Sequence, residues 1–250
     1  MANEDTPAIL EAAIKMWEES PSRRAPSPSS VMGCYRQNYF IQTGVPRTNR
    51  PDAESSISAE SGKATELVLL SLIQNAGIVD VEMQTDEERE IPEDLLATLN
   101  LTGGQYDAVG TTPDGERVLI ELKRKGVFQI LDRHKHEDLS VADEREYMQI
   151  QAMLHALGLD RCFYLAANWD RGALTRHSKG KGPDRTVGIY TEWITRNPIS
   201  AKVIAQRGQK LQDYLQVEDV SSVPREFDVN KDWQCKAPWC GWREACLAAK

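Results

Sequence analysis

Two carboxylates and a lysine are spaced so that they can form one charged site. Asp107 lies near the start of one predicted strand, and Glu121 and Lys123 lie near the end of the next. A turn at Pro113–Gly115 joins the two strands into a hairpin and brings these ends together. Glu121 and Lys123 are two residues apart, so their side chains point to the same face of the strand. A charge inside the apolar run 118–122 is costly, which favours a functional site there.

Such a cluster has a definite chemistry. Mg²⁺ takes oxygen ligands and is usually held by one or two carboxylates, while a lysine can orient or deprotonate a water or offset charge on a phosphate. Metal, water and lysine beside a phosphodiester are the parts of a nuclease site. Glu66 can add a carboxylate from a neighbouring helix, and Gln151 is either a site residue or an ordinary helix-surface amide. Asp followed by Glu-x-Lys also occurs by chance in exposed hairpins.

The elements that must position these residues follow an α/β pattern. The spacing of apolar residues predicts helices over 7–19, 31–42, 61–77, 145–158 and 198–216. It predicts strands over 79–84, 162–169 and 186–194, and two more within 101–123 around the turn at 113–115. Residues 46–61 and 126–143 are predicted as loops. We therefore expect an α/β core with a mixed central sheet flanked by helices. We divide the chain into an N-terminal helix with a Ser/Pro/Arg linker, 1–28, and a single domain, 29–250.

The charge is unevenly distributed along the 250 residues. There are 38 acidic and 30 basic residues, giving a net charge of −8, which excludes a uniformly basic nucleic-acid surface but not a local basic groove. Residues 75–96 carry eight acids and one Arg, whereas residues 161–186 carry six bases and two acids. The candidate DNA contacts are Arg36, Arg124, Lys125, Arg176, Lys179 and Lys181. The absence of a long apolar run or a basic-then-apolar start predicts a cytoplasmic protein without a membrane span.

Four of the five cysteines are grouped at the two ends of the chain. Cys34 precedes the charged motifs, and Cys235, Cys240 and Cys246 form a C-x4-C-x5-C pattern in the tail. Four thiolates can hold either a tetrahedral Zn²⁺ or an iron–sulfur cluster, and the spacing alone does not separate these two. Cys162 opens an apolar strand and is predicted to be a buried small hydrophobic residue.

The motifs together resemble a known superfamily. Gly62-xxx-Glu66, Gly104-x-x-Asp107, Glu121-x-Lys123 and Gln151-xxx-His155 are similar to the motifs of the PD-(D/E)XK nucleases, in particular the RecB-type branch with its CRISPR-associated and phage exonucleases. Position 66 is Glu where that branch often has His, and position 155 is His where Tyr is usual. The resemblance implies a restriction-endonuclease-like core and metal ligation by Glu66, Asp107, Glu121 and the backbone carbonyl of Leu122. It also implies that Lys123 is catalytic and that Gln151 orients substrate or Lys123.

The resemblance further implies a function. We expect an Mg²⁺- or Mn²⁺-dependent DNA exonuclease acting on single-stranded ends, in phage or CRISPR-type DNA processing or recombination, with protein partners there. A structural 4Fe-4S cluster held by the four grouped cysteines would join the N- and C-terminal parts of the chain, with zinc as the alternative. A different class remains open: a catalytically silent or zinc-stapled DNA-binding or assembly module on the same fold.

Overall fold

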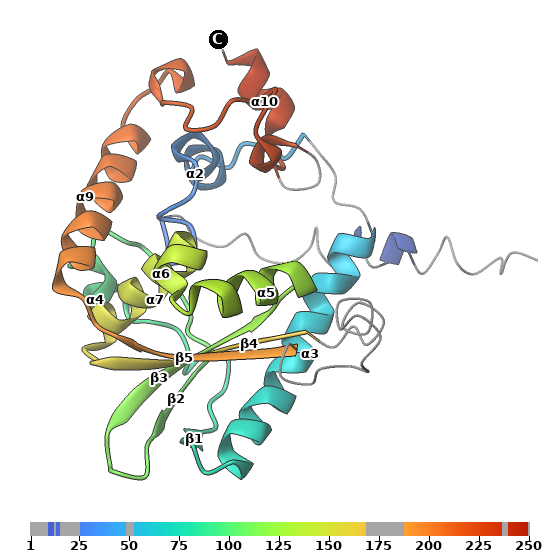
Figure 1. The fold of residues 1–250 in the computed structure, drawn as a ribbon. Helices are drawn as coiled ribbons and strands as arrows, with labels where there is room; N and C mark the ends of the chain where they lie inside the picture. Colours follow the sequence, from blue (N-terminus) through green and yellow to red (C-terminus); the bar gives the residue numbers. More distant parts are fainter. Residues whose placement is uncertain are drawn as a thin grey trace, which may run out of the picture.

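A five-stranded mixed sheet forms the centre of the protein in the computed structural model (Figure 1). The structure describes residues 10–12, 14–15, 26–48, 53–168, 188–236 and 240–249. The strands lie in chain order across the sheet: β1 (Asp80–Glu82), β2 (Ala108–Thr111), β3 (Arg117–Arg124), β4 (Arg161–Ala167) and β5 (Ile189–Thr195). β3 and β4 are parallel, and the other neighbouring pairs are antiparallel.

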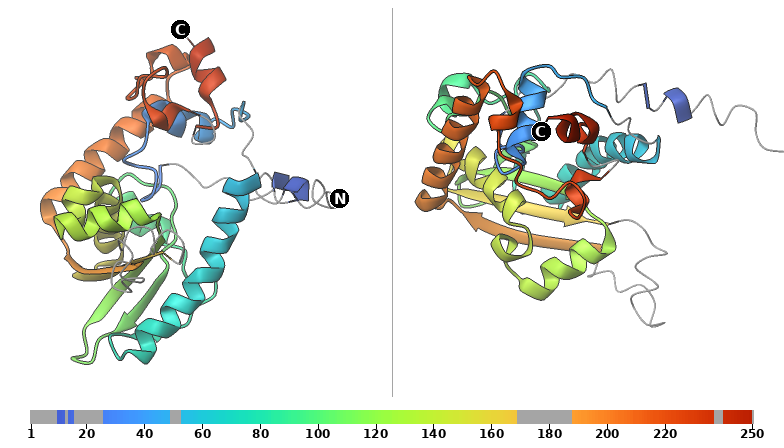
Figure 2. Two further views of the ribbon diagram at one scale, coloured as in Figure 1. Left: turned by 45° about the vertical axis from the view of Figure 1, so that its right-hand side comes forward. Right: turned by 90° about the horizontal axis from the view of Figure 1, so that it is seen from above.

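Helices cover both faces of this sheet (Figures 1 and 2). The helices are α2 (Tyr35–Gln42), α3 (Ala53–Asn75), α4 (Glu93–Ala97), α5 (Val127–His136), α6 (Leu139–Ala142), α7 (Glu144–Leu157), α9 (Pro198–Leu215) and α10 (Arg243–Ala248), with short 3₁₀ turns at Val220–Ser222 and Trp233–Cys235. Alternate residues of β3 face opposite sides because a strand has a period of two. Ile120 packs with Leu69 and Ile73 of α3, whereas Leu119 packs in the larger core that contains α7. The expected mixed sheet flanked by helices is therefore confirmed.

Two segments predicted as loops are helical instead. Residues 126–143 contain α5 and α6, because Val127, Ile130 and Leu139 are buried in the core while most of the charged side chains remain outside. α3 begins at Ala53, inside the polar stretch 46–61, and is longer than the predicted helix. The helix predicted over 31–42 is shorter in the structure, where α2 begins at Tyr35.

The N-terminal helix α2 and the C-terminal segment lie together beyond the sheet, and α9 runs up to them from the sheet (Figure 2). Trp242 Nε1 donates to the carbonyl of Val45 at 2.7 Å, and Thr48 N donates to the carbonyl of Gly241 at 2.7 Å. Residues from the two ends of the chain thus share one core. The domain division at residue 28 stays a prediction, although the Pro26 carbonyl accepts from Thr102 N at 2.9 Å. Among the described residues, no helix is both long and apolar enough to cross a membrane.

Candidate active site

The carboxylates and the lysine predicted from sequence meet where β2 begins and β3 ends. The pairing of Ala108 with Ile120 places Asp107, one residue before β2, next to Glu121 on β3. Asp107 Oδ2 accepts a hydrogen bond from Leu122 N at 2.7 Å, and Lys123 Nζ donates to Glu121 Oε1. Glu121 is 1% exposed, whereas the side chain of Lys123 is 24% exposed. The site therefore has a buried acid at its base and an ammonium near its opening.

The burial of Glu121 affects both its hydrogen bonding and its pKa. Its Oε2 is buried and has no hydrogen-bond partner among the described residues. Burial and the nearby Asp107 carboxylate raise the pKa of Glu121 to about 8, even though Lys123 opposes the shift. For Lys123, burial acts to lower the pKa, but the carboxylates of Glu121 and Asp107 outweigh it and the pKa rises. Lys123 is consequently an ammonium at neutral pH.

The glutamine of the site is Gln149 and not Gln151. Gln149 Nε2 donates to Glu121 Oε1 at 2.9 Å from the middle of α7. Gln151 is fully buried and points elsewhere: its Nε2 donates to the Thr195 carbonyl at 2.9 Å, and its Oε1 accepts from Asn197 N at 2.7 Å. The structure therefore does not place Gln151 beside Lys123, and its predicted role in orienting substrate stays a prediction. These two residues of one helix face different directions, and eight of the fourteen residues of α7 are buried, so the sequence pattern did not distinguish them.

His155, the second residue of the predicted Gln151-xxx-His155 motif, contacts the same turn as Gln151. Its ring Nε2 lies 2.9 Å from the Asn197 carbonyl, where Asn197 is the N-cap of α9. Gln151 and His155 together anchor the turn between β5 and α9.

Glu66 lies on α3 beside these groups and faces an arginine. Arg89 Nη1 is 3.8 Å from Glu66 Oε2, and the same nitrogen donates to the Asp107 carbonyl at 3.1 Å. Within the described part of the chain, no three His, Cys, Asp or Glu side chains are arranged to hold a metal ion as they stand. The structure brings Asp107, Glu121 and Lys123 together, but it does not gather Glu66 with the two other carboxylates into a ligand set. Ligation by Glu66 and by the Leu122 carbonyl stays a prediction.

The structure places the residues predicted to contact DNA in different surroundings. Arg36 is 4% exposed and donates to the carbonyls of Ser221, Val223 and Ala249, so its expected contact with DNA is wrong. Lys125 pairs with Glu146, and its side chain is 14% exposed. Arg124 is exposed and donates to Ser61 Oγ on α3. Arg176, Lys179 and Lys181 lie outside the described residues.

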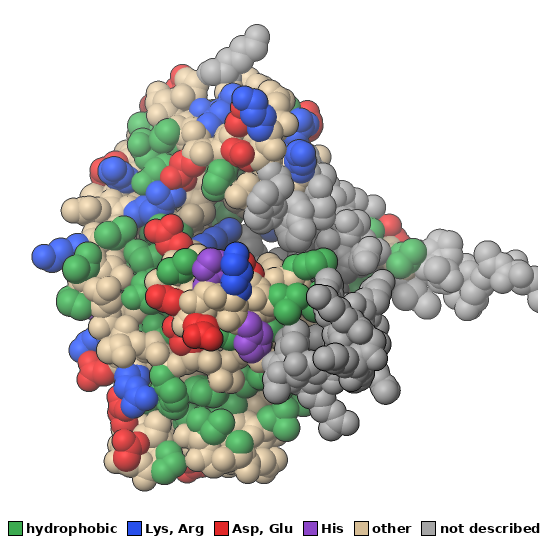
Figure 3. Space-filling model, viewed as in Figure 1, with side chains coloured by type: hydrophobic (Ala, Val, Ile, Leu, Met, Phe, Trp, Pro, Cys, Tyr) green, Lys and Arg blue, Asp and Glu red, His purple; other side chains and the backbone are tan. Residues whose placement is uncertain are grey.

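Lys125 belongs to a buried network that extends from the site into α5 and β4. Glu146 on α7 accepts from Arg133 Nη2 at 2.6 Å and from Tyr164 Oη at 2.8 Å, in addition to pairing with Lys125. Arg133 is 2% exposed and also donates to the Tyr164 oxygen and to Asp143. This arrangement satisfies a buried arginine with two acids and a phenol. On the face shown in Figure 3, basic and acidic side chains are interspersed, without a continuous basic band among the described residues.

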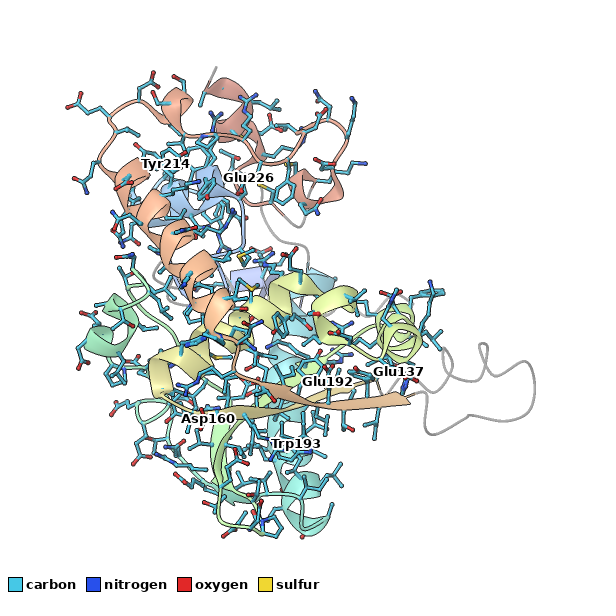
Figure 4. All side chains as sticks on the ribbon, turned by 60° about the vertical axis from the view of Figure 1, so that its left-hand side comes forward. Glu137, Asp160, Glu192, Trp193, Tyr214 and Glu226 are labelled. Atoms are coloured by element: carbon cyan, nitrogen blue, oxygen red, sulfur yellow. The ribbon has the colours of Figure 1, made fainter. Side chains whose placement is uncertain are left out.

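The four grouped cysteines lie near one another where the two chain ends meet, but among the described residues no three of them are arranged to hold a metal ion as they stand. Cys34 precedes α2, Cys235 ends a 3₁₀ turn, and Cys246 lies on α10. Burial raises the pKa of Cys235 to about 11, and the neighbouring thiols of Cys240, Cys34 and Cys246 contribute to this rise. Close by, the Tyr35 ring lies 5.2 Å from that of Tyr214, and Tyr35 N donates to Glu226 at 2.9 Å. Figure 4 shows Tyr214 and Glu226 at this end of the molecule. Cys162 is fully buried in β4, as predicted.

Comparison with known proteins gives structural but not sequence matches. No protein-family model matches the chain, and no curated protein matches it. The alkaline exonuclease LHK-Exo from Laribacter hongkongensis superposes with a TM-score of 0.54 and 17% identity over 82% of this chain and 92% of that one. Its complex with dAMP gives 0.53 and 15% over 84% and 93%, and the crystal structure of a protein called SSO0001 gives 0.53 and 16% over all of both chains. At these identities the likeness shows the fold, which is shared with a nuclease structure.

Proposed function

We propose that this chain is a divalent-metal-dependent nuclease that hydrolyses phosphodiester bonds in DNA. The observation that carries the proposal is the buried Glu121 Oε2, which lacks a hydrogen-bond partner in the described part of the chain while an acid and an ammonium lie beside it. A buried carboxylate oxygen without a donor is costly, and a cation would satisfy it. The shared fold with an alkaline exonuclease supports the same class of reaction.

The residues present fit a hard divalent cation. Asp107 and Glu121 supply carboxylate oxygens, which Mg²⁺ and Mn²⁺ prefer, and Glu66 can approach from α3. When bound, such a cation polarises a phosphoryl oxygen and lowers the pKa of a water. The two carboxylates are already oriented before any cation enters: Leu122 N fixes Asp107, and Gln149 together with Lys123 fixes Glu121.

Lys123 has a charge role in this proposal. Because the carboxylates of Glu121 and Asp107 raise its pKa, Lys123 keeps its proton at neutral pH before any cation is bound. Its ammonium is partly exposed next to the carboxylates, where it can hold a phosphate oxygen and offset the charge that develops there.

Labelled DNA incubated with Mn²⁺ tests the activity. We expect Asp107→Asn and Lys123→Met each to lose DNA cleavage by at least about a hundredfold, because each removes a group at the reacting phosphate. Lys202→Met, which changes an exposed lysine on α9, is the matched control and should cleave like the wild type. Cleavage at the wild-type rate by Asp107→Asn would refute the site.

The finer expectation is an exonuclease that acts on single-stranded ends. Linear and circular DNA of the same sequence, single- and double-stranded, separate the possibilities. An exonuclease digests the linear single strand and leaves the circle intact, whereas digestion of the circle would show endonuclease activity. Work in phage recombination or CRISPR-type processing, with protein partners there, belongs to the same proposal.

A catalytically silent DNA-binding module is the second candidate. The observation that favours it is that no three potential ligands in the described residues are gathered as they stand. Its expected result is DNA binding without cleavage at any Mg²⁺ or Mn²⁺ concentration, unaffected by Asp107→Asn.

We also propose that Cys34, Cys235, Cys240 and Cys246 hold a 4Fe-4S cluster, with zinc as the alternative occupant. The thiols of Cys34, Cys240 and Cys246 contribute to the raised pKa of Cys235, which supports the proximity of the four, and thiolates are ligands for both groups. Anaerobic purification should give a broad absorbance near roughly 400 nm. Cys240→Ala should lose colour and solubility together, whereas Cys162→Ala, which alters the core cysteine, should keep the colour. Stoichiometric zinc in a colourless protein would assign the alternative.

A further inference from the structure

One arginine reaches the candidate site from the most acidic part of the chain. Arg89 is the single basic residue among 75–96, where eight acids lie. Its Nη1 donates to the Asp107 carbonyl at 3.1 Å and lies 3.8 Å from Glu66 Oε2, while its Nη2 pairs with Asp86. The guanidinium therefore lies next to both the Asp107 carbonyl and the Glu66 carboxylate.

The backbone holds Arg89 firmly in this place. Tyr106 N donates to the Arg89 carbonyl at 3.2 Å, and Glu90 and Gln105 form an isolated β-bridge beside it. Tyr106 Oη also donates to the Glu88 carbonyl at 3.0 Å. These contacts tie the turn before α4 to the residues just ahead of Asp107, so the guanidinium stays next to Glu66 without needing a long flexible reach.

We propose that Arg89 competes with a divalent cation for Glu66 and so restrains metal loading of the site. An arginine is charged at any physiological pH, so its attraction for Glu66 is permanent. To ligate a cation, Glu66 must turn from Arg89 towards Asp107 and Glu121, and the arginine then lies close to a like charge. Both effects oppose cation binding. This accounts for the observation that Glu66 faces Arg89 and is not gathered with the two other carboxylates among the described residues.

The inference rests on the proposed metal-dependent function and is tested by metal binding itself. Mn²⁺ alone is titrated calorimetrically into the full chain without DNA. We expect Arg89→Gln to bind Mn²⁺ on the order of tenfold more tightly than the wild type. Arg89→Lys, which keeps the charge, should stay near the wild type. Arg117→Gln, which removes a surface arginine paired with Glu82 at 2.9 Å, is the matched control and should leave the affinity unchanged.

A double-mutant cycle with Glu66→Gln shows whether the effect acts through Glu66. In the Glu66→Gln background, Arg89→Gln should no longer tighten Mn²⁺ binding. The neutral double variant also guards against misfolding, because it leaves neither member of the pair charged and alone. Equal tightening of Mn²⁺ binding by Arg89→Gln with and without Glu66 would overturn the proposal. Unchanged or weaker Mn²⁺ binding by Arg89→Gln would also overturn it and would mean that Arg89 positions Glu66. A wild-type chain without an Asp107-dependent Mn²⁺ site would refute the proposed function, and this inference with it.

Discussion

Replacing Gln149 and Gln151 separately by Met should divide activity from stability, although the two residues are close together on α7. Met keeps the unbranched length of Gln and removes only its amide. Gln149 gives up one hydrogen bond to Glu121, at 2.9 Å. Gln151 gives up two hydrogen bonds to the backbone of the β5–α9 turn, at 2.9 Å to Thr195 and 2.7 Å to Asn197.

The magnitudes follow from what each change leaves unpaired. Gln151 is fully buried, so Gln151→Met leaves a carbonyl and an N–H without partners, at about 1–3 kcal/mol each. We expect the free energy of unfolding to fall by about 2–5 kcal/mol and Tm by roughly 5–15 °C. After Gln149→Met, Glu121 Oε1 still accepts from Lys123, so no group loses its last partner. Tm should then change by about 2 °C or less, while cleavage falls roughly tenfold to a hundredfold because the carboxylate is less firmly oriented.

Thermal unfolding and DNA cleavage with Mn²⁺ are measured on the same preparations, with cleavage assayed well below the lower Tm. At that temperature Gln151→Met is folded and should cleave at close to the wild-type rate. The reasoning is refuted if Gln151→Met keeps its Tm and loses cleavage, since that pattern belongs to a residue of the site. Wild-type cleavage by Gln149→Met would show that its contact with Glu121 has no catalytic consequence.

Two further outcomes follow from burial and charge. Because the pKa of Glu121 is raised to about 8, a proton competes with the cation below that pH, and Mn²⁺ affinity by calorimetry should tighten by up to about tenfold per pH unit until pH 8. The folded, metal-free state binds this proton more tightly than the unfolded state. The stability of the wild type, relative to Glu121→Gln, should therefore fall as pH rises from 4.5 to 8. A rise in the relative Tm over this range would contradict the raised pKa. Arg36→Met should cost about 3 kcal/mol or more in urea unfolding, because four carbonyls lose a buried donor. In an Asp107→Asn background, Arg36→Met should leave the DNA affinity measured by fluorescence anisotropy unchanged. A selective loss of DNA affinity would support the predicted contact of Arg36 with DNA.

The centre of the candidate site could be predicted from sequence because short-range geometry determines it. A strand has a period of two, so Glu121 and Lys123 had to share a face, and a tight turn ending in Gly115 set the hairpin register. Gly115 has a φ of +89°, which suits glycine at this turn. With Ala108 opposite Ile120, Asp107 reaches Glu121 without any tertiary information.

The surroundings of the basic residues were harder to predict, because the distribution of charge along the sequence does not show which groups each basic side chain contacts. Arg36 and Lys125 appeared to extend a basic groove, yet each is held within the protein by groups distant in sequence. The same reason explains the loop predicted at 126–143. Arg133 looks like a surface residue in sequence but lies inside the core, where Glu146 and Tyr164 satisfy it. A polar pattern therefore concealed the buried side of α5.

Helix α7 shows most clearly why the carboxylates were predictable and the glutamine was not. Glu146 and Gln149 are three residues apart and face β3, where they bind Lys125 and Glu121. Gln151 and His155 are four apart and face the turn at Asn197. The two residues that contact the site thus precede the two that anchor α9 on a helix with eight of its fourteen residues buried, so hydrophobic periodicity does not separate them. One helix therefore makes both sets of contacts, and only the tertiary partners of each side chain distinguish the two sets.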